Sequence, residues 1–442
     1  MNTCIKKKSE QGAILVGILI VGVIVSTVLV ALVTLVTQEH KMLTQSATWN
    51  SALPQAEAGI EEAMSHMRQV GVGPRSVNGW TLTSVTNVYL TRTNSEGAFK
   101  VLISGATPPI VTSTGLVWSA RTGKYIQRRI RANTKGISYF MKAISAKEKI
   151  NFGGQMSVDS YDSSNPLYNT GGVYDSAKKK DKGDVATNDS TPGAITLGGQ
   201  STIYGSLATG PTGTVVMANP SQVSVGSLAY VSGGGTGIQT NKYAKDMNVS
   251  FPNVEEPYTW GSTGVLPSPI LGIAAVPSLI SGTNYAHTLV TGNHSINTLS
   301  LGNSAHWVVT GAAQLYVKNG VSIQGSITIL PGASLQLYVQ SGTVSFSGNG
   351  VRNATGFAGN FGLWCMPAVT SVTFSGDANF VGTVYAPNSI LDFSGGGSTG
   401  LDFQGAAVAK TAVGSGKFKF HYDEQLQNTG LRNLQVVSWK EI

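Results

Sequence analysis

An uncharged, strongly apolar run from Ala13 to Thr37 constrains this chain more than any other feature. It follows a short leader, Met1–Gly12, whose basic residues are Lys6, Lys7 and Lys8. As a helix, about 25 residues extend roughly 38 Å, and the hydrocarbon core of a bilayer is about 30 Å thick. The run therefore predicts a transmembrane helix over residues 13–37. The lysines predict a cytoplasmic leader, with the rest of the chain outside the cytoplasm.

A cleavable secretory signal is the alternative explanation for a basic leader and an apolar run. Signal sequences usually have only about 7–15 apolar residues, followed by a cleavage site with small side chains. Here the run is longer, and the helical pattern continues beyond it, with Ala56, Ile60 and Ala63 at helical spacing. We therefore predict a retained anchor with a helical extension over residues 38–72. Pro54 predicts a kink in this extension or its division into two helices.

The next segment, residues 73–136, consists of short strand-like runs separated by turns. The runs are Trp80–Leu90, Phe99–Ser104, Ile110–Trp118 and Tyr125–Ala132. Neither an amphipathic helix nor a small sheet can bury its apolar surface alone, so the helix and the strands are expected to pack together. The sequence thus predicts a small α+β module in which an antiparallel sheet covers the helix.

Two N-terminal segments, 6–16 and 55–63, resemble type IV pilin-like proteins, and most closely the PilX-like pilus assembly proteins. The resemblance implies that a prepilin peptidase cuts after Gly12 and leaves Ala13 as the mature N-terminus in a bacterial cytoplasmic membrane. The lipid bilayer and pilin or minor pilin subunits are then the other partners. Most pilins have a glutamate at the fifth mature position, where this chain has Gly17. The missing carboxylate implies an accessory or initiating subunit. An ordinary single-span anchor is the alternative.

The region beyond residue 136 has an unusual composition. Charged residues make up only 12% of the whole chain, which contains 54 glycines, but 41% of the chain is hydrophobic, and this argues against disorder. Apolar triplets recur at Leu315–Val317, Val321–Ile323 and Ile327–Ile329, each beginning six residues after the previous one. Each triplet predicts a short strand whose outer members point inward. Stacked coils of such strands can bury apolar faces that are too short to form a core singly.

Longer repeats support the stacking. Phe380–Ala386 is similar to Phe403–Ala409, 23 residues later, and a Phe-Ser-Gly turn occurs at Phe346, Phe374 and Phe393. A repeat of this length suits one coil of a parallel β-helix. We therefore predict a chain that is mainly β with a long N-terminal α-helix, in which the small α+β pilin-like module is followed by a right-handed parallel β-helix (solenoid) over residues 137–442. A β-sandwich or jelly roll with antiparallel pairing is the alternative.

Four segments of this C-terminal region resemble an uncharacterised bacterial family in which a pilin-like N-terminus carries a β-solenoid. They are Val158–Ser163, Gly183–Asn188, Tyr385–Asn388 and His421–Glu424. The resemblance implies the fold and no particular activity.

The open ends of a solenoid need covers, because an exposed terminal coil presents unpaired backbone groups. The helical pattern of Ile137–Lys147 predicts a cap for the first coil, and the segment from Asp423 to Leu434 predicts a cap for the last. Ser438–Lys440 is expected to return as a final strand.

Many β-helix enzymes cleave acidic polysaccharides with several carboxylates in one groove. The candidates here, Asp377, Asp392 and Asp402, stand alone at predicted turns, where a single aspartate usually accepts hydrogen bonds from its own backbone. We therefore predict no catalytic residues and no cofactor.

Two clusters invite a metal interpretation. In His421–Glu424 only alternate residues share a face of the strand, and Asp423 and Glu424 suit the start of a helix. The second cluster departs from the spacing of an EF-hand loop. Its members are Asp181, Asp184, Asn188 and Asp189. No metal site is predicted at either position.

A basic run, Lys178–Lys182, contributes to the formal net charge of +8. Removal of the leader, with three lysines and one glutamate, would leave +6. No aromatic platform accompanies the run, so nucleic acid is not an expected partner. A solvated loop, or contact with an anionic surface polysaccharide, is expected. Cys4 lies in the leader, and Cys365 is expected to be a small buried apolar group.

Together these features predict a non-catalytic, membrane-anchored accessory subunit that displays a β-solenoid for pilus assembly or surface adhesion. A surface carbohydrate-active enzyme and a cell-envelope scaffold outside any pilus are the alternatives.

Overall fold

The computed structural model describes residues 10–70, 79–84, 87–104, 108–262, 264–266, 279–280, 282–348, 350–375, 379–394, 400–428 and 432–442. The chain divides into two compact units. Unit 1 contains Met1–Lys135 together with Leu434–Ile442, and unit 2 contains Gly136–Asn433. The two units are described separately. As predicted, the chain is mainly β with one long N-terminal helix and large parallel sheets.

Unit 1 begins with the helix α1, Glu10–Val70, which is 61 residues long. Its side chains from Ile14 to Ala47 are all exposed, and within the described parts of the chain α1 is the one helix long and apolar enough to span a membrane. The sequence predicted that Pro54 would kink the helix or divide it in two, and α1 runs through Pro54 without being divided. The neighbouring Ala52 and Ala56 are fully buried, so packing against the sheet holds the helix on both sides of the proline.

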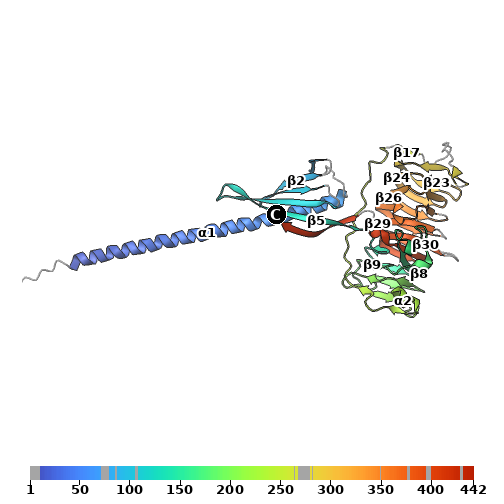
Figure 1. Ribbon diagram of the computed structural model, residues 1–442, viewed down its shortest axis with the longest axis horizontal. Coiled ribbons are helices and arrows are strands. Elements are labelled where there is room, and N and C mark those ends of the chain that lie inside the picture. The colour runs from blue at the N-terminus through green and yellow to red at the C-terminus, as the bar shows by residue number, and fades with distance from the viewer. Residues whose placement is uncertain are drawn as a thin grey trace, which may run out of the picture. The chain divides into compact units, whose positions relative to one another are not determined.

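The α1 helix packs on a six-stranded sheet with the order β1-β2-β3-β4-β5-β32 (Figure 1). The strands are β1 (Thr81–Leu82), β2 (Val88–Thr93), β3 (Ala98–Ile103), β4 (Ile110–Ser119), β5 (Lys124–Ser138) and β32 (Arg432–Glu441). Neighbours from β1 to β5 are antiparallel, as the sequence predicted. Met64, Met67, Trp80 and Val101 form part of the core between helix and sheet.

The C-terminal strand β32 belongs to this sheet. Its Glu441 carboxylate accepts two hydrogen bonds from Arg128 of β5, at 2.6 and 2.5 Å, and Ser438 accepts one from Asn133 at 3.0 Å. The predicted final strand therefore exists, but it pairs with the first unit. Unit 2 is consequently an insertion between two strands of one sheet, β5 and β32.

Close approach between α1 and β4 depends on Gly115. A Cβ atom there would lie 2.1 Å from the carbonyl oxygen of Ala52 and 2.5 Å from the amide nitrogen of Ala56, both of which are backbone atoms that cannot move aside. We expect Gly115→Val to push α1 away from the sheet and to destabilise unit 1 by about 3 kcal/mol. Faster amide hydrogen exchange in residues 52–67 would report the separation. Thr112→Val, on the other face of β4, should leave this exchange unchanged, and equal rates in both variants would contradict the role of Gly115.

Unit 2 is built from parallel strands that return beside one another after each circuit of the chain. One circuit, which we call a coil, passes through Leu315, Val321 and Ile327, and these pair with Leu337, Val344 and Val351 of the next. The predicted triplets thus occupy three faces of one coil. The later part of unit 2 contains β17 (Val265–Leu266), β20 (His287–Leu289), β21 (Gly292–Ile296), β22 (Leu299–Leu301), β23 (His306–Val309), β24 (Ala312–Ile323), β25 (Ser326–Ile329), β26 (Ser334–Phe346), β27 (Gly350–Asn353), β28 (Phe361–Phe374), β29 (Asn379–Phe393), β30 (Leu401–Gly414) and β31 (Lys417–Asp423).

The earlier part of unit 2 has shorter strands. They are β6 (Ile144–Ala146), β7 (Ile150–Phe152), β8 (Gln155–Tyr161), β9 (Val185–Thr187), β10 (Ile195–Leu197), β11 (Thr202–Tyr204), β12 (Leu207–Ala208), β13 (Val215–Met217), β14 (Ser224–Gly226), β15 (Gly237–Ile238) and β16 (Tyr243–Ala244), with a short helix α2 (Leu228–Ser232). Between named strands of the described part of unit 2, the one antiparallel pair is the hairpin of β18 (Leu279–Ile280) and β19 (Thr283–Asn284). An antiparallel sandwich or jelly roll therefore does not describe this unit.

The coils do not stack in the order of the sequence. The last coil, in β30 and β31, pairs with the first coil, in β6, β7 and β8. The first coil pairs on its other side with β9, β10 and β11. Figure 1 shows this arrangement, with β30 in red between β29 and the green strands β8 and β9. The stack thus runs from β17 through β30 to β8 and then to β16, and the first and last coils meet inside it.

This order corrects the predicted caps. β6 lies within the proposed N-terminal cap, Ile137–Lys147, but has a parallel neighbour on each side. Asp423 also lies on an interior coil, opposite Tyr161. Among the described residues, the strands at the two ends of the stack are two or three residues long, and so short an edge offers little backbone to another chain. They are β13, β15 and β16 at one end and β17, β20 and β22 at the other.

A connecting segment, residues 247–261, runs back along the stack from the β12 coil to the β21 coil. Its hydrogen-bond partners lie progressively further along the stack. The contacts, in chain order, join Met247 to Thr209, Val249 to Asn188, Pro252 to Tyr385, Glu256 to Tyr316 and Gly261 to Ser295. This strap carries the chain from one end of the stack to the other, which is what allows the final coils to wind back toward the first.

Columns of phenylalanine fill the interior of the later coils. Phe346, Phe374 and Phe393, from the repeated Phe-Ser-Gly turns, pair in register and stack with ring centroids 5.1 and 5.7 Å apart. The 23-residue repeat is also in register, with Phe380 opposite Phe403 at 4.6 Å. These repeats of the sequence are therefore positions stacked on one another in space.

Candidate functional site

A buried polar cluster lies where the first and last coils meet. We call it the polar seam, and it consists of Asp159, Ser160, Ser163, Tyr174, Lys180, Asp402, His421, Asp423 and Glu424. β8 supplies Asp159 and Ser160, β31 supplies His421 and Asp423, and the long connection from β8 to β9 folds over both strands. Alternation along β31 points Phe420 and Tyr422 into the apolar core and His421 and Asp423 outward, under this connection.

His421 is the centre of the polar seam. Its Nδ1 lies 2.5 Å from Asp159 Oδ1, and its Nε2 lies 3.7 Å from Asp402 Oδ2. The ring of Tyr174 stacks on the imidazole with centroids 3.5 Å apart, and its hydroxyl donates to Asp159 at 2.7 Å. His421 is only 3% exposed. Burial lowers the pKa of His421, but the hydrogen bond to Asp159 and the charge of Asp402 outweigh it and raise this pKa to about 9.

The other two acids of the seam hold the loop and the last coil together. Glu424 is 6% exposed and accepts from Ser160 at 2.9 Å and from Lys180 at 2.6 Å. Asp423 accepts from the backbone and hydroxyl of Ser163. Asp423 is also the N-cap of a short 3-10 helix, Glu424–Gln427, which confirms its predicted capping role.

The geometry of His421 predicts a pH-dependent stability. Because its pKa is raised in the folded state, His421 contributes stability that is fully present below about pH 6.5 and is lost as the pH rises to about 9, by roughly 3 kcal/mol. Tyr174, whose pKa burial raises above its ordinary value, adds a further loss only above about pH 10. Amide exchange of residues 417–423 should therefore accelerate between pH 6.5 and 9 beyond the intrinsic rate. His421→Gln should remove this dependence, and a pH dependence that persists in that variant would contradict the assignment.

The other acidic residues that the sequence analysis considered as metal ligands or catalytic groups do not lie close together. Asp184 pairs with Lys142 at 2.7 Å, Asp181 accepts from the amide of Leu228, and Asp189 accepts from Thr191. Within the described residues no three His, Cys, Asp or Glu side chains are grouped to bind a metal ion. Of the three carboxylates considered for catalysis, Asp402 alone joins the seam. Asp392 lies on β29, and Asp377 is outside the described residues.

The lysines of the basic run Lys178–Lys182 make more hydrogen bonds and ion pairs than the sequence predicted. Lys178 donates to the carbonyl of Asn169 at 2.6 Å, and Lys179 lies 3.9 Å from the ring centre of Tyr204. Lys180 and Lys182 both pair with Glu424. The expectation of a solvated basic loop is therefore wrong for Lys178, Lys179 and Lys180, which are half-buried, whereas Lys182 remains exposed.

Cys365 is fully buried, and burial raises the pKa of its thiol, as expected for a small apolar group. Among the described residues of unit 2, Tyr168 is the one aromatic side chain that reaches 36% exposure, and Lys180 covers its ring at 4.4 Å. Unit 2 therefore presents no broad aromatic platform for sugars within its described part.

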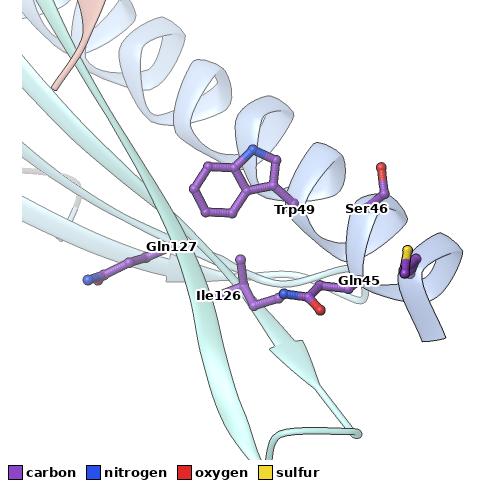
Figure 2. Close-up of a pocket in the computed structure, with 6 residues that line it drawn as sticks. Gln45, Ser46, Trp49, Ile126 and Gln127 are labelled. Atoms are coloured by element: carbon purple, nitrogen blue, oxygen red, sulfur yellow. The ribbon is translucent and has the colours of Figure 1, made fainter. Parts of the chain in front are cut away.

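Exposed aromatic residues are concentrated in unit 1. They are Trp49, Tyr89, Trp118, Tyr125 and Trp439. Trp49 borders an open groove of about 550 Å³ between α1 and β5, together with Met42, Ile126 and Gln127 (Figure 2). Arg128 lies 5.4 Å from the Trp49 ring centre. The groove is shallow and mostly apolar, which suits contact with another apolar surface better than the chemistry of a small molecule.

The predicted processing residues lie at the start of α1, and the predicted anchor extends to its middle. Gly12, Ala13 and Gly17 are within the helix, whereas Lys6, Lys7 and Lys8 are outside the described residues. The hydroxyl of Thr37, at the end of the apolar run, donates hydrogen bonds to the backbone carbonyl groups of Val33 and Thr34. This bonding satisfies the polar group of Thr37 within the helix, as an apolar environment requires.

The sequence did not predict the partnership of Asp159 with His421. Both residues lie in segments that carry the second resemblance, but they are 262 positions apart. Without knowledge of the coil order, nothing in the residue pattern brings these segments together.

Comparisons with known proteins give limited information. A family model described as "Domain of unknown function (DUF7305)" matches residues 279–429, the later coils of unit 2. No curated protein matches. Among solved structures, the competence-associated pilin ComZ from Thermus thermophilus is similar with 11% identity and a TM-score of 0.28, covering 89% of this chain and 97% of that one. At that TM-score the similarity carries no argument about fold or function.

Proposed function

We propose that this chain is a membrane-anchored, pilin-like accessory subunit that displays unit 2, a right-handed β-solenoid, outside the bacterial cytoplasm for pilus assembly or surface adhesion. The observation that carries the proposal is that one part of α1 is exposed and the other part is packed against the sheet. Its side chains from Ile14 to Ala47 are exposed, whereas Ala52 to Met67 pack on the antiparallel sheet. An uncovered apolar helix of this length suits lipid, or the apolar helices of neighbouring subunits.

The finer role rests on the resemblance to PilX-like proteins. Cleavage by a prepilin peptidase would remove the basic leader and leave Ala13 at the membrane end of α1. Gly17 provides no carboxylate for a neighbouring subunit's amine, which favours an accessory position over a place in the body of the filament. The parallel coils of unit 2 support the solenoid, because the neighbouring strands β24, β26, β28, β29 and β30 of its later coils pair in parallel.

The processing step can be tested by mass spectrometry of the mature N-terminus, with the protein isolated from membranes of cells that contain a prepilin peptidase. We expect a methylated Ala13. Gly12→Leu, which alters the cleavage site, should leave the leader attached, and Gly17→Ala is the matched control inside the helix. An intact leader in the wild-type protein would contradict the pilin-like assignment and favour an envelope scaffold.

We also propose that unit 2 is not an enzyme. The seam acids Asp159, Asp402 and Glu424 are held by His421 and the lysines, and Asp159 is only 2% exposed. Asp159 and Glu424 are therefore buried away from a polymer substrate, and Asp402, which is half-buried, is the one seam acid of these three that a substrate could reach. A screen of the intact protein against acidic and neutral polysaccharides should yield no cleavage product, and a product that disappears in an Asp402→Asn variant would overturn this proposal.

A further inference from the structure

The turn that joins β4 to β5 combines two exposed aromatic side chains with two cations. Trp118 and Tyr125 lie opposite each other on the two strands, are 54% and 59% exposed, and pack edge to face with ring centroids 5.2 Å apart. Between them the exposed turn carries Arg121 and Lys124. We call residues 118–125 the aromatic hairpin.

The contacts of Arg121 show which part of α1 lies beside the hairpin. The Arg121 side chain donates to the side-chain oxygen of Gln45 at 2.9 Å and lies 3.5 Å from the carbonyl oxygen of Lys41. These residues are four to eight positions beyond Thr37, where the apolar run ends. At 1.5 Å per residue this places the tip of the hairpin, at Arg121, roughly 6–12 Å beyond the hydrocarbon edge, and the headgroup layer is about 5–8 Å thick. Trp118 and Tyr125 lie further from the bilayer than this tip.

We propose that the aromatic hairpin is a second membrane contact, in which the tip lies at the phospholipid headgroups, Arg121 and Lys124 bind anionic ones, and Trp118 and Tyr125 contact the outer edge of this layer. Tryptophan and tyrosine favour this layer because one end of each ring system is apolar and the other is polar. The cations add attraction to anionic lipid. On the same side of the span α1 presents Met42 and Leu43, each 68% exposed. This inference rests on the proposed membrane anchorage of α1.

The same sheet provides an internal contrast. The turn between β2 and β3 is held to α1 by Asn94, which donates to Gln55 at 3.0 Å. Gln55 is 18 positions beyond Thr37, so this turn lies roughly 27 Å from the hydrocarbon edge. It has an exposed Glu96 and no aromatic residue, and we expect no contact with lipid.

Depth-dependent fluorescence quenching tests the proposal on the full-length protein in vesicles of zwitterionic and anionic phospholipids. An environment-sensitive label is attached at Thr122→Cys in the hairpin, Ser95→Cys in the contrasting turn, or Ser26→Cys within the apolar run. Cys4→Ser is the common background, and Cys365 is buried and should not react. Lipids that carry a spin label near the headgroup should quench the Thr122 label severalfold more strongly than the Ser95 label.

The three positions separate the hairpin proposal from the anchor. The label at position 26 should be quenched by a spin label deep in the acyl chains. If it is not quenched, the membrane anchor itself is contradicted. If Ser26 is quenched but Thr122 and Ser95 behave alike, the hairpin proposal fails and the anchor stands. Trp118→Ala should reduce the quenching at Thr122, and Lys124→Glu should remove its dependence on anionic lipid. Unchanged quenching in both variants would also overturn the proposal.

Discussion

Asp159→Ala is expected to lower the free energy of unfolding of unit 2 by about 3–5 kcal/mol, because it leaves a buried positive charge without its partner. Asp159 accepts hydrogen bonds from the Nδ1 of His421 and from the hydroxyl of Tyr174, and both His421 and Asp159 are almost wholly buried. Amide exchange of residues 155–161 and 417–423 in the full-length protein should accelerate together, because the two strands form the two sides of the seam.

Asp392→Ala is the matched control for this change. Asp392 lies on the outer face of β29, is half-buried, and has no hydrogen bond to another described side chain. Its removal should change the stability by less than about 0.5 kcal/mol. If the two substitutions have the same effect, or if only one side of the seam is loosened, the polar seam does not hold the first and last coils together.

Phe403→Ala is expected to destabilise unit 2 by a similar amount, about 3–5 kcal/mol, through a cavity in the apolar interior. The Phe403 ring is fully buried and stacks between Phe380, at 4.6 Å, and Phe420, at 4.4 Å. The loss should appear as faster exchange on the neighbouring coils as well as on β30, because each ring supports the next.

Two further variants calibrate the effect of Phe403. Phe403→Leu keeps much of the volume and should cost less than Phe403→Ala. Ile390→Ala removes a side chain that is 46% exposed and should cost little. Equal losses for Phe403→Ala and Ile390→Ala would mean that the phenylalanine columns are not the core of the stack.

Local patterns in the sequence predicted much of the fold. The run Ala13–Thr37 predicted the exposed half of α1, since an uncharged stretch of that length has few alternatives. The triplet Leu315–Val317 predicted a short strand, because alternation of apolar residues reflects the two faces of a strand. The repeat of Phe380 at Phe403 predicted stacking, and the two residues are in register.

The order of the coils could not be predicted from these patterns. Each triplet indicates a strand that needs a neighbour, but nothing in Ile144–Ala146 indicates that one neighbour is Ala407–Ala409, at the other end of the unit. The sequence analysis expected caps over the first and last coils because it assumed that the stack begins with the first coil of the chain and ends with the last. The partnership of Asp159 with His421 was missed for the same reason.

The insertion of unit 2 gives a physical reason for this order. β5 and β32 are neighbours in one sheet, so the chain must leave for unit 2 and return from it at nearly the same place. A stack wound in sequence order would put its two ends far apart, separated by about 4.8 Å for each coil. Entry and exit at adjacent interior coils bring the ends together, and the strap over residues 247–261 makes this possible.

Disulfide formation between chosen pairs of adjacent coils is the most direct test of this order. Ser157 pairs with Lys419 on one side and with Thr202 on the other, and all three side chains lie on the outer face. Neighbouring strands are about 4.8 Å apart, which is within the range of a disulfide, whereas strands two coils apart are not. Cysteine pairs at 157 and 419, and at 157 and 202, should both oxidise rapidly, and the pair at 202 and 419 should not. Rapid oxidation of 157 with 202 but not of 157 with 419 would contradict the meeting of the first and last coils.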